Sequence, residues 1–300
     1  MTIIQALQDR DLLGRLPAFR QLESWARWLI FLASAYGLPL DSNEQEDLFC
    51  HHTGRSRYAP PSGGYKTIVA LMGRQAGKDR IAAAIVDYEA SQAQHEPDGT
   101  DLVAMAVCQD LRGAMRTQFS YMTAPFLSVP ALAQLVATAP TRDTLRLTNG
   151  VTLAAYPCRP AAVRGVRALV VVLNELGFYL SSEGNPMDTE MLRASRPCLA
   201  TTGGRLVILS SPYAQAGALY DLHRRHFGQD DSDTLVWKAS APEMNPTLPS
   251  DYLERMAKDD PEAYQSEVLG EFRAGVSALF SDSDVLEAAV DRGVKERLPI

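Results

Sequence analysis

A short apolar run, a polar turn and an alanine-rich stretch follow one another between residues 67 and 92. Thr67–Leu71 (TIVAL) is predicted to be a buried strand, and Ile81–Gln92 has the composition of a helix. Between them lies the turn Gly73-Arg74-Gln75-Ala76-Gly77-Lys78-Asp79. In a strand–turn–helix unit, backbone N–H groups of such a turn can cradle phosphate oxygens, and a lysine can neutralise their charge. The segment therefore predicts a P-loop in which Lys78 reaches the β- and γ-phosphates.

This turn departs from the common P-loop pattern at two positions. Met72 stands where the first glycine is usual, and Asp79 stands where a Ser or Thr usually helps to hold magnesium. The alternative interpretation is a glycine-containing surface turn with an exposed lysine.

Two further apolar runs end in polar pairs. Ala168–Leu173 is followed by Asn174 and Glu175, and Arg205–Leu209 is followed by Ser210 and Ser211. In P-loop ATPases, an acidic pair at a strand end helps to hold Mg²⁺ and polarises the attacking water. Glu175 is therefore the candidate general base, and the two serines are candidates for sensing the γ-phosphate. The alternatives are a strand end capped by polar residues and an ordinary Ser-Ser-Pro turn.

Fully apolar strands that alternate with helices predict an α/β fold with a mostly parallel central sheet flanked by helices. A further buried strand is expected at Leu102–Val107, and a helix is expected from Asp110 to Met122. A β-hairpin is expected at Thr144–Leu147 and Val151–Ala155, because Asn-Gly favours a tight turn between them.

Three regions are expected along the chain. Residues 1–52 form an N-terminal helical region with an amphipathic helix at 17–36. Residues 53–272 form the P-loop core, closed by a charged helical region after Pro249, and residues 273–300 form a linker.

Composition limits the possible partners. The chain is 46% hydrophobic and 22% charged, as in globular proteins, and its formal net charge of −7 means that any DNA contact needs a local basic patch. Its four cysteines form no CxxC pair, and neither Cys50-His51-His52 nor the pair His223 and His226 completes a zinc-ligand pattern. No secretory signal or membrane span is evident, so a cytoplasmic protein is expected.

In their order and spacing, these segments resemble the large terminase subunit of tailed double-stranded DNA phages. GRQAGKD resembles that family's deviant P-loop, VRGVRALVVVLNELGFY its Arg-Gly element and acidic strand, and LVILSSPY its coupling motif. The resemblance covers about residues 38–298. It implies a P-loop NTPase fold of the ASCE (RecA-like) type, with ATP and Mg²⁺ as cofactors.

The resemblance also implies an ATPase that drives double-stranded DNA into a procapsid in the host cytoplasm. The implied partners are the portal protein, the small terminase subunit and further copies of the chain in a ring, although a monomer in isolation is also open. A C-terminal nuclease is implied as well. Because this chain ends about where that nuclease would begin, and Asp282 and Asp284 lie in the linker, we expect no nuclease activity from it.

Residue roles follow from the same resemblance. Arg74 would act on the γ-phosphate of its own subunit. One arginine among Arg142, Arg159, Arg164 and Arg167 would act as an arginine finger on a neighbour, and Arg164 of the Arg-Gly element is the favoured candidate. Gln45 would bind the adenine edge, although a glutamine at a helix start is the alternative. The implied nucleotide-binding set is Gly73, Arg74, Gln75, Ala76, Gly77, Lys78, Asp79 and Gln45.

Asp79 and Asn174 are the expected metal residues, and their chemistry is unusual. The carboxylate on the P-loop could replace the one that the strand lacks, Asn174 could be an introduced residue, or the domain could be a weak or inactive ATPase. A non-catalytic scaffold that binds DNA or portal is therefore an alternative function. A small-molecule kinase is a third, but the sequence has no lid-like arginine cluster.

Overall fold

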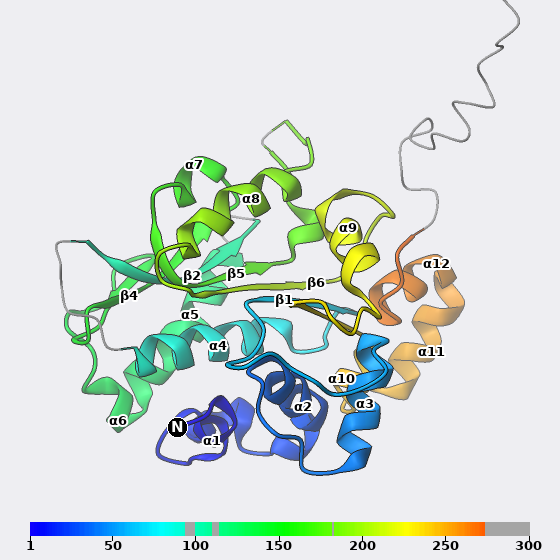
Figure 1. Cartoon of the computed structure of the whole chain (residues 1–300), viewed down its shortest axis with the longest axis horizontal. Coiled ribbons are helices and arrows are strands. Elements are labelled where there is room, and N and C mark those ends of the chain that lie inside the picture. The colour runs from blue at the N-terminus through cyan, green and yellow to red at the C-terminus, as the bar shows by residue number, and fades with distance from the viewer. Residues whose placement is uncertain (94–99, 110–113, 182, 274–300) are drawn as a thin grey trace, which may run out of the picture.

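A seven-stranded sheet runs through the computed structural model, which describes residues 1–93, 100–109, 114–181 and 183–273 (Figure 1). The strand order is β3-β4-β2-β5-β6-β1-β7, and only the β3–β4 pair is antiparallel. The strands are β1 (Thr67–Met72), β2 (Leu102–Cys108), β3 (Thr144–Arg146), β4 (Val151–Pro157), β5 (Arg167–Asn174), β6 (Arg205–Ser210) and β7 (Thr234–Ala239). The predicted α/β class with a mostly parallel sheet is confirmed.

Helices cover both faces of this sheet (Figure 1). One face carries α1 (Ile3–Gln8), α2 (Ala26–Ala35), α3 (Asn43–Thr53), α4 (Lys78–Gln92), α5 (Ala114–Ser128), α6 (Pro130–Ala133) and α10 (Ala241–Met244). The other face carries α7 (Pro160–Val163), α8 (Asp188–Ser195) and α9 (Gly217–His226). The short α11 (Ser250–Asp259) and α12 (Pro261–Ala263) follow at one end of the sheet.

The apolar strands form because they are buried on both faces. All seven residues of β2 are buried. In β1, Ile68, Ala70 and Met72 join one core cluster, whereas Val69 and Leu71 join the other, as the two-residue repeat of a strand requires. The N-terminal helices share the first cluster through Ile3 and Trp28, so residues 1–52 pack as part of the core.

The sheet order brings three strand ends together. β6 lies between β1 and β5 and runs parallel to both. The carboxyl ends of these strands therefore meet at one edge of the sheet, which is where open α/β sheets bind ligands. The predicted P-loop (residues 73–79) follows the end of β1. Asn174 and Ser210 are the last residues of β5 and β6, and Glu175 and Ser211 come directly after them.

The structure corrects several expected elements. The helix predicted at 17–36 is wrong before Ala26, because two 3₁₀ turns precede α2 and the Trp25 indole N–H donates to the Ala18 carbonyl, 2.8 Å away. Strand β7 was not predicted. The hairpin is confirmed, with Leu145 opposite Leu153. The start of the helix expected from Asp110 and the linker after Arg273 lie outside the described residues.

The cysteines are unpaired, and the described helices are short or polar. The four cysteines are free, and burial raises the pKa of Cys108 and Cys158 to about 12, so those thiols stay protonated. Within the described ranges, every helix is too short or too polar to cross a bilayer.

A buried carboxyl group on α4 makes stability depend on pH. Asp87 is 1% exposed, its Oδ1 has no hydrogen-bond partner among the described residues, and burial raises its pKa well above the usual range. The folded protein therefore holds a proton that the unfolded chain releases, so this carboxyl destabilises the fold as pH rises above its ordinary pKa. We expect Asp87→Asn to raise the Tm at pH 8 by at least about 2 °C, roughly 1 kcal/mol at this size.

The same substitution is expected to change the Tm little at pH 4, where the wild-type carboxyl is already protonated in both states. The exposed Asp259 on α11 provides the matched control, Asp259→Asn. Thermal unfolding at both pH values checks the prediction. Equal shifts at pH 4 and pH 8 would show that ionisation of Asp87 does not limit stability.

Candidate functional site

The P-loop forms the floor of a pocket of about 570 Å³ at the carboxyl end of β1. Residues 74–80 line one side of it, and Glu175 lines another. Segments far away in the sequence complete the wall, namely Ser24, Trp25, Tyr121, Met244, Asn245 and Thr247. Its volume is in the range of small-molecule and cofactor sites.

The shape of the P-loop is fixed by groups outside it. The Trp28 indole donates to the Ala76 carbonyl at 2.7 Å, and the Asn245 amide donates to the Gln75 carbonyl at 2.8 Å. Gly77 has φ +97°, and a Cβ there would lie 2.9 Å from the Trp25 ring. A Cβ at Gly73 would lie 2.7 Å from the Glu267 carbonyl oxygen, so both glycines are required by close approach as well.

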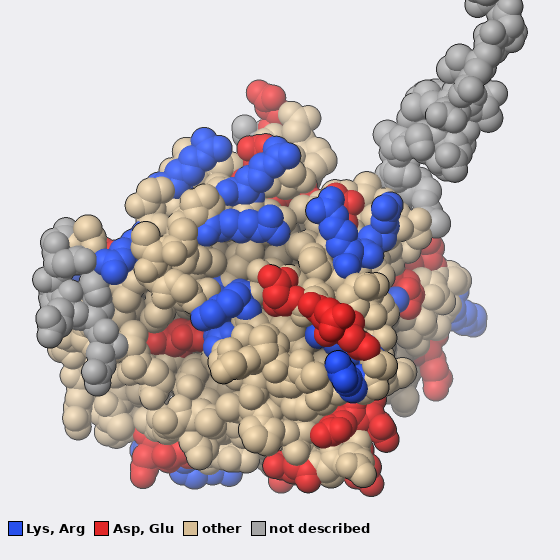
Figure 2. Space-filling model, in the orientation of Figure 1, with Lys and Arg blue, Asp and Glu red and all other residues tan. Residues whose placement is uncertain are grey.

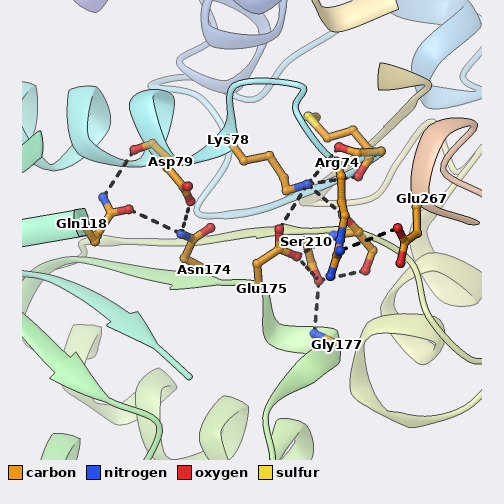
Figure 3. A network of polar contacts seen from close by, with 12 residues as sticks. Arg74, Lys78, Asp79, Gln118, Asn174, Glu175, Gly177, Ser210 and Glu267 are labelled. Carbon is orange, nitrogen blue, oxygen red and sulfur yellow. Dashed lines mark hydrogen bonds and ion pairs between the residues drawn. The ribbon is translucent and has the colours of Figure 1, made fainter. Parts of the chain in front are cut away.

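Lys78 lies at the first position of α4, and its side chain is only 5% exposed (Figure 3). Its ammonium group donates to Ser211 Oγ at 2.8 Å and to the Gly73 carbonyl at 2.9 Å. Glu175 Oε1 is 3.2 Å away and balances the charge. Ser211, which follows β6, and Glu175, which follows β5, therefore both contact Nζ of Lys78.

Glu175 follows β5 in a left-handed conformation, with φ +63°. In the described part of the chain, Gln75 is the other non-glycine residue with positive φ, so both such residues lie at this site. Such backbone strain is often found at functional sites. Glu175 Oε2 accepts the Ser211 N–H at 2.9 Å, and its side chain is 33% exposed, so the carboxylate is anchored yet open to the pocket.

Ser210 and Ser211 link these parts. Ser211 binds Lys78 through its hydroxyl and Glu175 through its N–H. Ser210 Oγ accepts the Gly177 N–H at 3.1 Å, which ties the end of β6 to the turn after Glu175. A movement of Lys78 or Glu175 would therefore change the hydrogen bonds of Ser211 at the end of β6.

Asp79 and Asn174, the two predicted metal residues, are in contact with each other. Asn174 Nδ2 donates to Asp79 Oδ1 at 2.6 Å, and a buried glutamine, Gln118, accepts from the same amide at 3.4 Å (Figure 3). Asp79 is exposed and lines the pocket, whereas Asn174 is 6% exposed and lies behind it. Asn174 Oδ1 is buried without a partner among the described residues.

Arg74 points from the P-loop toward the C-terminal part of the domain. Its guanidinium group lies 3.6 Å from Glu267 Oε2 and 6.0 Å from the centre of the Phe178 ring. With 58% of its side chain exposed, it can move toward a bound anion in the pocket. Glu267 belongs to a single π-helical turn, Tyr264–Val268, an element that is frequent at functional sites.

Two predicted residues lie elsewhere. Gln45 does not line this pocket: it sits in the first turn of α3, and its Oε1 accepts the Asp41 N–H at 2.9 Å. This is the helix-start position that was the alternative interpretation, and adenine binding by Gln45 stays a prediction. Arg164 follows α7 on the surface with 64% of its side chain exposed, and it lies 3.9 Å from Glu190.

Sequence reasoning missed the walls of the pocket. Trp25 carries no signal beyond its place in an apolar pattern. Gln118, which contacts Asp79 and Asn174, was also missed, because it stands among other polar residues of its helix, such as Thr117 and Ser120.

A cluster of possible metal ligands lies elsewhere, where the side chains of His51, His52 and Glu243 place their ligand atoms within 4.8 Å of one another. Both ring nitrogens of His52 already have neighbours, because Arg27 lies 3.3 Å from Nε2 and the Lys238 carbonyl oxygen lies 2.9 Å from Nδ1.

Known structures share this architecture. The chain is similar to the large terminase ATPase domain of Thermus phage P74-26, with a TM-score of 0.56 and 16% identity over 77% of this chain and 98% of that domain. It is also similar to the HK97 bacteriophage large terminase, with a TM-score of 0.55 and 17% identity over 78% of this chain. That match covers 51% of the HK97 protein, so this chain spans about half of its length.

A third similarity is to the large terminase of a thermophilic bacteriophage, with a TM-score of 0.50 and 14% identity over 78% of this chain and 54% of that one. No protein-family model matches the sequence, and comparison with curated proteins finds no match. The predicted fold, a mostly parallel sheet flanked by helices, is confirmed and is shared with these terminase ATPase domains.

Proposed function

We propose that this chain is the ATPase motor domain of a terminase large subunit, which hydrolyses ATP to move double-stranded DNA into a procapsid. The observation that carries the proposal is the meeting of Lys78 and Glu175 at 3.2 Å in a pocket of about 570 Å³. A P-loop lysine beside a carboxylate that follows another strand of the same sheet suits phosphoryl transfer to water, and here that strand, β5, is separated from β1 by β6. The shared fold supports the terminase assignment.

The side chains in the pocket fit ATP with Mg²⁺. The pocket contains a buried lysine and two arginines at its rim, Arg74 and Arg80, for the phosphate charge. The Asp79 carboxylate faces the same space, and Mg²⁺ accepts such oxygens while keeping several waters. Asn174 lies in contact with Asp79, and its buried, unpaired Oδ1 is an oxygen that suits a water donor. When bound, the metal would neutralise part of the phosphate charge.

Each residue then has a defined task. Lys78 binds phosphate oxygen with the donors that it now shares among main-chain oxygens, Ser211 and Glu175. Once Lys78 has turned to phosphate, the Glu175 carboxylate, held by the Ser211 N–H, orients a water and accepts its proton at Oε1. Arg74 exchanges Glu267 for the γ-phosphate. Ser210 and Ser211 transmit these changes to β6, in accordance with the predicted coupling role.

The surface fits the proposed partners. Lys and Arg side chains gather over α7, α8 and α9 (Figure 2), and the exposed arginines there are Arg159, Arg164, Arg193, Arg196, Arg224 and Arg225. Such a patch supplies the local positive charge that DNA phosphate needs, despite the net charge of −7. Arg164 is exposed and loosely paired, which suits an arginine finger acting on a neighbouring copy in a ring. The portal and the small terminase subunit complete the proposed assembly.

The test is ATP binding followed by turnover, each with Mg²⁺ and with or without double-stranded DNA. We expect Mg²⁺-dependent hydrolysis that DNA accelerates, and we expect the acceleration to weaken as salt rises because phosphate contacts are electrostatic. Nucleotide and DNA binding without turnover would instead support the scaffold alternative, which the uncharged Asn174 favours. A protein that binds no nucleotide would overturn the proposal.

A further inference from the structure

Gln118 is a buried polar residue of α5 that contacts both Asp79 and Asn174. It is 1% exposed, and both ends of its side-chain amide are used (Figure 3). Its Nε2 donates to the Asp79 carbonyl and its Oε1 accepts from Asn174 Nδ2, each at 3.4 Å. A buried polar group is costly unless it is paired, so this placement calls for a role.

These contacts fix the orientation of the Asn174 amide. Its two N–H groups have two acceptors, Asp79 Oδ1 at 2.6 Å and Gln118 Oε1 at 3.4 Å. A flipped amide would set Asn174 Oδ1 against both of these oxygens, which would repel it. Gln118 cannot flip to relieve that repulsion, because its own Nε2 is held by the Asp79 carbonyl.

The fixed amide in turn holds the Asp79 carboxylate. One carboxylate oxygen, Oδ1, is bound by Asn174, while the residue itself lines the pocket. We propose that Gln118 and Asn174 are positioning residues that hold Asp79 as the carboxylate ligand for the nucleotide's Mg²⁺. This inference rests on the proposed function and adds a residue, Gln118, that no sequence pattern marks.

The arrangement also explains why an amide stands at position 174. An aspartate there would place a second carboxylate about 2.6 Å from Asp79 Oδ1 and beside the Gln118 carbonyl oxygen. Like charges at this distance disfavour the ionised forms of both groups. The carboxylate therefore resides on the P-loop helix and the amide on the strand, and restoring the more common strand aspartate alone should harm the site.

The experiment measures ADP affinity of the full chain while Mg²⁺ is titrated, with EDTA defining the metal-free state. For Gln118→Leu we expect metal-free ADP affinity within about 2-fold of wild type, because the phosphate contacts of Lys78 are untouched. The Mg²⁺ concentration at half effect should rise about 10- to 100-fold, the usual cost of losing a partner that orients a metal ligand. Gln134→Leu, on the exposed end of α6, is the matched control.

A second pair of variants keeps the inference testable if Gln118→Leu unfolds. Asn174→Asp should also raise the Mg²⁺ midpoint at least about 10-fold. The exchange Asp79→Asn with Asn174→Asp moves the carboxylate to a buried position beside the Gln118 carbonyl oxygen, so it should not recover that loss. If the wild type fails to bind ADP with Mg²⁺, the proposed function fails. If it binds, but Gln118→Leu or Asn174→Asp leaves the midpoint unchanged, the positioning role is wrong.

Discussion

Lys78→Ala is expected to lower ATP turnover at least about 100-fold, because it removes the positive group that would bind the developing phosphate charge. Its ammonium group is buried and held beside the pocket by Ser211, Gly73 and Glu175, from which it turns to phosphate when nucleotide binds. Loss of a charged hydrogen bond costs about 1.5–3 kcal/mol, which corresponds to roughly 10- to 100-fold weaker nucleotide binding.

Steady-state ATP hydrolysis and nucleotide titration check this prediction, and thermal unfolding confirms that the variant is folded. Lys258→Ala is the matched control, since Lys258 lies exposed on α11 away from the pocket. Unchanged turnover in Lys78→Ala would contradict the P-loop assignment itself, because Lys78 is the lysine of this loop and supplies the ammonium group beside Glu175.

The strands of the core could be predicted because their burial is a local property of the sequence. Val170, Val171 and Val172 lie in an uninterrupted apolar run, which is what a strand covered on both faces requires. Strand β7 was not predicted, because its apolar residues are interrupted by the polar residues Thr234 and Lys238. Such a pattern is less distinct than that of a central strand, and β7 lies at the edge of the sheet. The helix expected at 17–36 was wrong in its first half. The apolar spacing runs through Trp25 without a break, but the Trp25 indole N–H donates to the Ala18 carbonyl, and the chain forms 3₁₀ turns there.

The chemical centre of the site could be predicted for a topological reason. Lys78, Glu175 and Ser211 each follow a buried strand, and parallel strands bring such residues to one edge. The walls of the pocket could not be predicted, because Trp25 and Asn245 reach it through packing between segments that are distant in the sequence. Gln45 illustrates the converse: its position in the chain suggests adenine binding, but α3 places it in a local hydrogen bond with Asp41.

The strained backbone of Glu175 determines what a substitution there can change. The residue is held with φ +63° by the Leu209 carbonyl, which accepts its N–H at 2.7 Å. Its carboxylate has two separable contacts, the Ser211 N–H with Oε2 and Lys78 with Oε1. A glutamine can keep the first contact through its carbonyl oxygen, but it cannot form the ion pair or accept a proton from water.

Glu175→Gln is therefore expected to lower ATP turnover by about 10²- to 10⁴-fold, the usual contribution of a general base. Nucleotide affinity should be kept or become tighter, because Lys78 no longer has Glu175 as a competing partner for phosphate. Single-turnover hydrolysis and equilibrium nucleotide binding separate the two effects, with Glu254→Gln on the exposed face of α11 as the control. Weaker binding with an unaltered hydrolysis rate would show instead that Glu175 only supports the P-loop lysine.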